Sequence, residues 1–256
     1  MSILQGQVAW VTGGGSGIGR AGAIELARAG ATVVISGRDA AKLQAAIADA
    51  PADLRARLEA LALDVADAAA VAQAGQELLG RHGRVDVLVN SAGINFPRRR
   101  WDETDSTIFE RVVAVNLSGA THATLAVLPA MRARGQGTVI NVSSFAGWHL
   151  VGLTGPAYTA SKAGMIALTH SLNIEQGPHG LRATAICPGE VATPILRTRP
   201  VVPSADEQAR MLQEADLGRT IAFVATQPPH VCINQIVISP VHNRLYVGGG
   251  ELGGPR

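Results

Sequence analysis

A tyrosine and a lysine four positions apart are the residues of this sequence best suited to acid–base chemistry. Tyr158 and Lys162 enclose Thr159-Ala160-Ser161, and on a helix this spacing places both side chains on one face. A neighbouring ammonium favours phenolate over phenol, so we expect Lys162 to lower the pKa of Tyr158 from its ordinary value of about 10. Such a tyrosine can act as a general acid toward a carbonyl oxygen. The same pair also occurs by chance on many helices, so the rest of the sequence must support this interpretation.

A glycine-rich segment near the N-terminus is a candidate phosphate site. The segment Thr12-Gly13-Gly14-Gly15-Ser16-Gly17-Ile18-Gly19 follows a short apolar run and opens a helix-like run. Glycines allow a tight turn and the close approach of a pyrophosphate, and a helix N-terminus offers unpaired N–H groups. A strict GxGxxG search matches residues 17–22 instead, but that register runs into the helix. The TGxxxGxG spacing therefore predicts the site, and a glycine turn without a ligand is the alternative.

The elements that must position these residues alternate along the chain, and short β-rich runs followed by longer helical runs predict a parallel sheet. The expected strands are Val8–Thr12, Thr32–Ser36, Leu58–Leu63, Val85–Asn90, Gly137–Val142, Arg182–Cys187 and Ile233–Ser239. The expected helices are Gly17–Ala29, Ala40–Ala50, Ala66–Arg81, Ser106–Arg134, Ala157–Gln176 and Ala205–Thr226. No Ser/Gly/Pro-rich linker interrupts the first 240 residues, so we expect one domain over residues 1–256. Residues 241–256 are expected to form a C-terminal tail that ends in a mobile segment, Gly248–Arg256.

Composition excludes several classes of protein. With 256 residues, 47% of them apolar, the chain can bury a substantial core. The formal charge is only +2, and we interpret the one basic run, Arg98-Arg99-Arg100, as a solvated loop, so we expect no nucleic-acid partner. Cys187 and Cys232 are expected to pack in the core, without a disulfide or a metal site. We see no signal peptide and no uninterrupted apolar span, which predicts a cytoplasmic protein without a membrane partner.

Four motifs together resemble one known family. They are TGGGSGIG at Thr12–Gly19, Asn90-Ser91-Ala92-Gly93, Tyr158 with Lys162, and Pro188-Gly189 followed by Thr193-Pro194. In this order they are similar to the short-chain dehydrogenase/reductase family, over about residues 5–240. The resemblance implies an α/β fold, a single Rossmann-type domain with a doubly wound parallel sheet of about seven strands. It also implies a nicotinamide cofactor and hydride transfer between a carbonyl and an alcohol.

The resemblance assigns four catalytic positions. The family's serine corresponds to Ser144, with Ser143 as the neighbouring alternative, and its hydroxyl should hold the substrate oxygen. The family's asparagine corresponds to Asn116, which is expected to bend a helix and to hold a water that relays protons to Lys162. Tyr158 and Lys162 are the other two catalytic positions.

The resemblance also assigns the cofactor contacts. They are Gly13, Gly15, Ser16, Gly17, Ile18, Gly19, Arg38, Asp64, Val65, Asn90, Ala92, Gly93, Tyr158, Lys162, Pro188, Gly189, Val191 and Thr193. Asp64 is expected beneath the adenine ring, while Thr193 and the backbone of Val191 should meet the nicotinamide carboxamide. Asn90 is expected to bond backbone between strands near the cofactor.

The residues after the second expected strand favour NADP(H) over NAD(H). An NAD site places a carboxylate there for the ribose 2′-hydroxyl, but this chain has Gly37 in that slot, with Arg38 beside it. A guanidinium suits the oxygens of a 2′-phosphate. Asp39 would oppose this choice if it turned inward, but as the residue before a helix it is expected to be an N-cap.

Some family features are absent, and others leave the function open. Ser91 replaces the second Asn of the common Asn-Asn-Ala-Gly, and the common Val-Asp-Gly-Gly ending is missing. The resemblance implies a homotetramer, with Ala120, Ala123 and Ala126 and with Ala160, Ala163 and Ala167 on two pairing helices. Residues 195–216 are expected to form a lid over a small carbonyl or alcohol substrate. A non-catalytic cofactor-binding sensor or scaffold, an imine reductase and an epimerase remain alternative functions.

Overall fold

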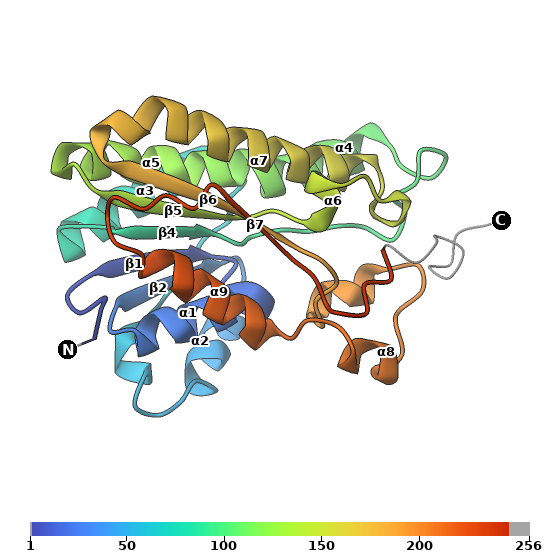
Figure 1. Cartoon of the computed structure of the whole chain (residues 1–256), viewed down its shortest axis with the longest axis horizontal. Helices are drawn as coiled ribbons and strands as arrows, with labels where there is room; N and C mark the ends of the chain where they lie inside the picture. Colours follow the sequence, from blue (N-terminus) through green and yellow to red (C-terminus); the bar gives the residue numbers. More distant parts are fainter. Residues whose placement is uncertain (1, 246–256) are drawn as a thin grey trace.

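The computed structural model describes residues 2–245 and places seven strands in one parallel sheet (Figure 1). The strands are β1 (Val8–Thr12), β2 (Thr32–Gly37), β3 (Leu58–Ala62), β4 (Val87–Asn90), β5 (Gly137–Val142), β6 (Leu181–Pro188) and β7 (Gln235–Ile238). Their order is β3-β2-β1-β4-β5-β6-β7, and all neighbours are parallel. The order reverses between β1 and β4. At such a switch point an open α/β sheet binds its ligand outside the carboxyl ends of the strands.

Helices cover both faces of this sheet (Figure 1). They are α1 (Gly17–Arg28), α2 (Ala40–Ala48), α3 (Ala68–His82), α4 (Ser106–Val113), α5 (Gly119–Arg134), α6 (Phe145–Trp148), α7 (Pro156–Gln176), α8 (Ala205–Ala209) and α9 (Glu214–Ala225). α1, α2 and α9 lie on one face, and α3, α5 and α7 lie on the other. This arrangement confirms the Rossmann-type doubly wound α/β fold.

Two hydrophobic cores lie on the two faces of the sheet. All five residues of β1 are buried, and successive side chains of a strand point to opposite faces. Ala9 and Val11 therefore pack in the core that includes α1 and α9, whereas Trp10 packs in the core that includes α3 and α5. The indole nitrogen of Trp10 donates to Ser36 Oγ at 3.0 Å, which satisfies its one polar atom. Burial on both faces explains why the strands read as continuous apolar runs.

Each of the seven expected strands is present, with ends that differ by two residues or less, but two expected helices are interrupted. The segment 106–134 contains a π-helical turn at Ala114–Ser118, between α4 and α5. The segment 205–226 breaks into α8 and α9, because the backbone of Leu212 leaves the helix and pairs with that of Val191. The N–H of Leu212 donates to Glu190 O at 3.0 Å, and the N–H of Ala192 donates to Leu212 O at 2.8 Å. This pairing is a tertiary contact, which helical propensity does not predict.

Two expectations about buried and exposed residues are wrong. Cys187 is buried as expected, but Cys232 is exposed. Ala120 and Ala123 on α5 are buried in the chain's own core and are not available to a second subunit, whereas Ala160, Ala163 and Ala167 on α7 are exposed. Among the described residues, one helical stretch, Ser106–Arg134, is long and apolar enough by length and composition to cross a membrane. Its α5 part packs on α3 and the sheet, as a core helix does.

A buried arginine fixes the chain that leads into β7. The guanidinium of Arg182 on β6 donates to the carbonyl oxygens of Ala225, Gln227, Pro228 and Val231, at 2.5–3.3 Å, and to Thr138 Oγ1 at 3.0 Å. These acceptors include the end of α9. One guanidinium therefore satisfies the carbonyl oxygens of an irregular segment that lies against the sheet.

We expect Arg182→Met to lower the free energy of unfolding by about 3 kcal/mol or more, because it leaves several buried carbonyls without a donor. Chemical denaturation at constant pH measures this loss. Arg219→Met is the control, since the exposed Arg219 pairs with Asp216 on the helix surface and should contribute less than about 1 kcal/mol. A loss for Arg182→Met no greater than that of the control would contradict this role.

Candidate active site

A single cavity of about 780 Å³ lies outside the carboxyl ends of the strands and joins the two sites that the sequence predicted. It is lined by the glycine turn, by Tyr158 and Lys162 and by most of the other predicted residues, namely Ser144, Arg38, Asp64, Val65, Ala92, Gly93, Pro188, Gly189, Val191 and Thr193. Gly19, Asn90 and Asn116 do not line it and can act only from behind its wall. The sequence motifs, far apart in the chain, thus meet at one place.

The glycine turn is shaped for a close-lying ligand. Gly13 and Gly17 have φ angles of +69° and +60°, which favour glycine, and a Cβ on Gly13 would lie 2.7 Å from Ala92 Cα. A Cβ on Gly19 would overlap the carbonyl of Gly13. Ser16 precedes α1 without making a side-chain cap, so it leaves the first N–H groups of that helix available to a ligand. This cradle fits the pyrophosphate of a dinucleotide.

Asn90 supports the turn in a different way from that expected. Its Nδ2 donates to Asn141 Oδ1 at 2.9 Å and also lies near Ala120 O and Thr124 Oγ1 of α5. The contact between strands is therefore one of side chains, on β4 and β5, and the backbone partner lies on a helix. Thr12 holds the neighbouring loop instead, since its hydroxyl accepts from the N–H groups of Ser91 and Ala92.

The end of β2 presents positive charge to the cavity. Arg38 is exposed and lines the cavity beside Gly37, and Asp39 accepts a hydrogen bond from the N–H of Lys42 at 3.0 Å. Asp39 is therefore the N-cap of α2, as predicted. Sequence reasoning missed Lys42, which also lines this end of the cavity. Its place in the first turn of the helix, close after Arg38, is the signal that was available.

Asp64 lies at the same end and is held by neighbours. Its Oδ1 accepts from the N–H of Ala66 at 3.0 Å, and its Oδ2 pairs with Arg111 at 2.8 Å. Burial raises the pKa of Asp64, but the hydrogen bonds from Arg111 and Ala66 outweigh it and hold the pKa below its ordinary value. The carboxylate is thus ionised and fixed on the wall where the adenine ring is expected.

Ser144, Tyr158 and Lys162 form the other end of the cavity. Ser144 caps α6 by accepting from the N–H of Ala146 at 3.1 Å, and it lies close enough to Tyr158 to oppose the rise in that residue's pKa. Ser143, the alternative, donates its hydroxyl to the carbonyl of Lys162 at 2.7 Å and is buried. Ser144 is therefore the serine free to meet a substrate, while Ser143 fixes α7 against β5.

The pKa of Tyr158 beside Lys162 is not shifted in the direction that the sequence predicted. Lys162 is only 3% exposed, and its Nζ donates to Val142 O at 2.8 Å and lies 5.7 Å from the centre of the Tyr158 ring. Burial lowers the pKa of Lys162 to about 8. Burial also raises the pKa of Tyr158, against the opposing effects of Ser144 and of the charges on Arg199 and Arg99. The expected lowering of the tyrosine pKa by Lys162 is therefore wrong for this structure, because desolvation outweighs Ser144 and the two arginines that oppose it.

Asn116 lies behind the lysine, inside the π-helical turn. It is fully buried, and its Oδ1 accepts from the N–H of Ile94 at 2.8 Å while its Nδ2 donates to Ile94 O and Ser161 Oγ. The helix interruption expected at Asn116 is thus present. The side chain ties the loop after β4 to α7, one residue before Lys162. Such single π turns are frequent at functional sites.

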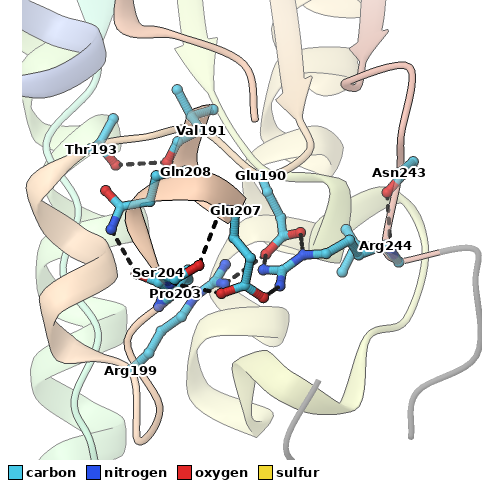
Figure 2. A network of polar contacts seen from close by, with 11 residues as sticks. Glu190, Val191, Thr193, Arg199, Pro203, Ser204, Glu207, Gln208, Asn243 and Arg244 are labelled. Carbon is cyan, nitrogen blue, oxygen red and sulfur yellow. Dashed lines mark hydrogen bonds and ion pairs between the residues drawn. The ribbon is translucent and has the colours of Figure 1, made fainter. Parts of the chain in front are cut away.

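A buried carboxylate joins the lid region to the end of the described chain (Figure 2). Glu190 is 3% exposed in its side chain, accepts from Arg199 at 2.6 Å and is bound by two nitrogens of Arg244 at 2.8 Å. Arg244 also pairs with Glu207 in the first turn of α8, and the Glu207 side chain forms a capping box with Ser204. The two arginines hold the pKa of Glu190 low although burial raises it. Arg244 of the expected tail therefore packs on the lid, and Gly248–Arg256 lies outside the described residues.

The lowered pKa of Lys162 has a consequence for stability. Its pKa falls from 10.5 to about 8 on folding, so the unfolded chain binds more protons between these values, and raising the pH through this range stabilises the fold. Lys162→Met removes the effect. We therefore compare the Tm of Lys162→Met with that of the unaltered protein at each pH. The difference, variant minus unaltered, should be about 5 °C larger at pH 7 than at pH 10.

Thermal unfolding at the two pH values measures this difference. Lys42→Met is a matched control, because Lys42 is exposed, and its relative Tm should be the same at both pH values. A relative Tm of Lys162→Met that does not change with pH would show that the buried ammonium carries no such cost.

Comparisons with known proteins agree with this geometry. The profile of the short chain dehydrogenase family matches residues 7–201. An uncharacterized oxidoreductase of Staphylococcus saprophyticus is 34% identical over 242 residues, which are 94% of this chain and 100% of the relative.

Two solved structures are similar over nearly the whole chain. A metagenomic short-chain oxidoreductase in complex with NADP has a TM-score of 0.79 and 33% identity, and the alignment covers 94% of this chain and 99% of the other. The 3-ketoacyl-(acyl-carrier-protein) reductase of Brucella melitensis, complexed with NADH, has a TM-score of 0.84 and 28% identity, with coverages of 94% and 99%. Because the family profile covers residues 7–201 and a relative is 34% identical over 94% of the chain, the chain belongs to the short-chain dehydrogenase/reductase family of oxidoreductases.

Proposed function

We propose that the protein is an NADP(H)-dependent carbonyl reductase or alcohol dehydrogenase. The observation that carries this proposal is that Ser144, Tyr158 and Lys162 line the same cavity as the glycine cradle. The nicotinamide group, when bound, supplies or accepts the hydride. The cradle of Gly13–Gly19 with Asp64 and Val65 would hold the adenosine and pyrophosphate part. Ala92, Gly93, Pro188, Gly189, Val191 and Thr193, which line the rest of the groove, would hold the nicotinamide end.

The side chains at the catalytic end would bind a carbonyl oxygen and transfer a proton to it. Ser144 and Tyr158 line the same end of the cavity, and Ser144 lies close enough to affect the pKa of Tyr158, so both hydroxyls can donate to one substrate oxygen. Tyr158 would give its proton to that oxygen in reduction and take it back in oxidation. Its raised pKa keeps the phenol protonated, which suits the acid role. Lys162, held by Val142 O, positions the tyrosine, and Asn116 supports the loop beside it.

The cofactor preference rests on the end of β2. Arg38 and Lys42 place two cations on the wall where a ribose 2′-phosphate would lie, and Asp39 is occupied in capping α2. NADP(H) is therefore favoured over NAD(H). The two similar structures described above contain NADP and NADH respectively, so the preference must be measured on this chain.

Three further proposals come from the sequence. A homotetramer remains a proposal, for which the exposed alanines of α7 offer a pairing surface. Residues 195–216 remain a proposed lid, because Ile195, Leu196, Thr198 and Arg199 line the cavity. A cytoplasmic location remains a prediction.

The alternative functions are separated by different observations. A sensor or scaffold has no need of two hydroxyls at the catalytic end of the cavity. Product analysis separates carbonyl reduction from imine reduction and epimerisation.

We expect Tyr158→Phe to keep cofactor binding and to lose turnover by about 10²–10⁴-fold, because only the proton donor is removed. Cofactor affinity is measured by fluorescence titration, and turnover is followed as oxidation of the reduced nicotinamide with a panel of ketones. Near-normal turnover in this variant would overturn the mechanism. No turnover of any carbonyl by the unaltered protein with either cofactor would favour the sensor or scaffold.

We expect Arg38→Leu to lower kcat/KM for NADPH by about 10-fold or more while leaving that for NADH nearly unchanged, because a charge-assisted bond to the 2′-phosphate is lost. The ratio of the two specificity constants measures this effect. Arg132→Leu, at an exposed arginine on α5, is the control. A preference of the unaltered protein for NADH, or a preference for NADPH that Arg38→Leu does not change, would show that Arg38 does not bind the phosphate.

A further inference from the structure

Arg99 is buried at the catalytic end of the cavity, contrary to the interpretation of Arg98-Arg99-Arg100 as a solvated loop. It is 6% exposed and lines the cavity together with Tyr158 and Arg199. Its neighbour Arg98 is largely exposed and pairs with Asp105. The triplet therefore has one member that turns inward, and the proposed mechanism gives that residue no task.

Two loops hold the Arg99 guanidinium in place, and a third packs against the backbone of Arg99. Its Nε donates to Phe96 O at 2.7 Å, and its Nη2 donates to the carbonyl of Thr198 and lies 3.3 Å from Thr198 Oγ1. Gly155, directly before α7, lies so close that a Cβ there would overlap the backbone of Arg99. The guanidinium is thus fixed where the loop after β4, the segment before Tyr158 and the start of the lid meet. No hydrogen bond of Nη1 is found among residues 2–245.

No ion pair of the Arg99 guanidinium is found among residues 2–245. Arg199 pairs with the buried Glu190, which also binds Arg244. Within residues 2–245 no carboxylate lies within ion-pair distance of the Arg99 guanidinium, and Glu103 contacts only its backbone N–H, at 3.4 Å. Burial and the charge of Arg199 lower the pKa of Arg99, against the weaker opposing effects of Tyr158 and Glu103. A buried cation of this kind favours an anion beside it.

The cofactor does not supply that anion. Its pyrophosphate belongs at the glycine turn, and a 2′-phosphate belongs beside Arg38 and Lys42, at the opposite end of the cavity. The group that reaches Tyr158 is the substrate. We infer that the substrate carries a carboxylate or a phosphate, and that Arg99 binds this group while the carbonyl lies at Ser144 and Tyr158. This inference rests on the proposed function and adds the class of substrate to it.

Arg99 could instead serve only to join the three loops, and matched substrates separate the two roles. Pyruvate and pyruvamide, and 3-oxobutanoate and 3-oxobutanamide, differ in charge but hardly in shape. Dihydroxyacetone phosphate and dihydroxyacetone test a phosphate in the same way. We measure kcat/KM for each member of a pair with the unaltered protein, Arg99→Met, Arg99→Lys and the control Arg98→Met.

We expect the unaltered protein to prefer the charged member of at least one pair by about 10-fold or more in kcat/KM, a typical effect of a hydrogen bond to a charged group. Arg99→Met should abolish this preference by lowering kcat/KM for the anion while changing that for the neutral partner only a few-fold. Arg99→Lys should retain part of the preference, and Arg98→Met all of it. Whether the acids or the phosphate show the preference identifies the anionic group.

A measurement on the unaltered protein does not depend on the folding of a variant. Salt screens charge interactions, so kcat/KM for the preferred anion should fall between low ionic strength and 0.5 M KCl, with no matching fall for its neutral partner. Equal kcat/KM values for both members of every pair would overturn the inference while leaving carbonyl reduction intact. An equal loss for both members in Arg99→Met would assign Arg99 a structural role only. Absence of turnover with every ketone would overturn the proposed function and this inference together.

Discussion

The burial of the Lys162 ammonium is the constraint on which the catalytic end of this protein depends. A charge that has lost its water needs an acceptor, and the fold provides Val142 O at the end of β5, with Met165 Sδ at 3.5 Å as a weaker second acceptor. To keep that contact, α7 must lie close to β5. Ser143 secures this position by donating to the carbonyl of Lys162, and Gly147 leaves room for the helix backbone. Tyr158, one turn earlier on α7, is placed by the same docking.

Most of the fold was predictable because its signals are local. Strands that are buried on both faces read as apolar runs, and Gly13 and Gly17 are required by the backbone angles of the turn itself. The N-cap role of Asp39 followed from its place before a helix. The break between α8 and α9 was not predictable, because it depends on the pairing of Leu212 with Val191, which are distant in sequence.

The candidate site was predictable where a motif carries the chemistry, and less so where environment does. Ser144, Tyr158 and Lys162 meet as the motifs indicated, but the shift in the tyrosine pKa had the opposite sign, because spacing on a helix says nothing about desolvation. Arg99 was hidden for a similar reason. Its burial arises from contacts with Thr198, 99 residues away, and nothing in the local sequence distinguishes it from its neighbours.

The ion pairs of Glu190 also limit the order in which contacts can form during synthesis of the chain. During synthesis Glu190 leaves the ribosome 54 residues before Arg244, which later binds it with two nitrogens. All residues of the sheet up to β6 and of the glycine turn are synthesised before that partner is available. Until then Glu190 has only Arg199 as an ion-pair partner, and α8 lacks its contact with the C-terminal segment. The ion pairs that hold the lid are therefore among the last contacts of the described chain that can form during synthesis.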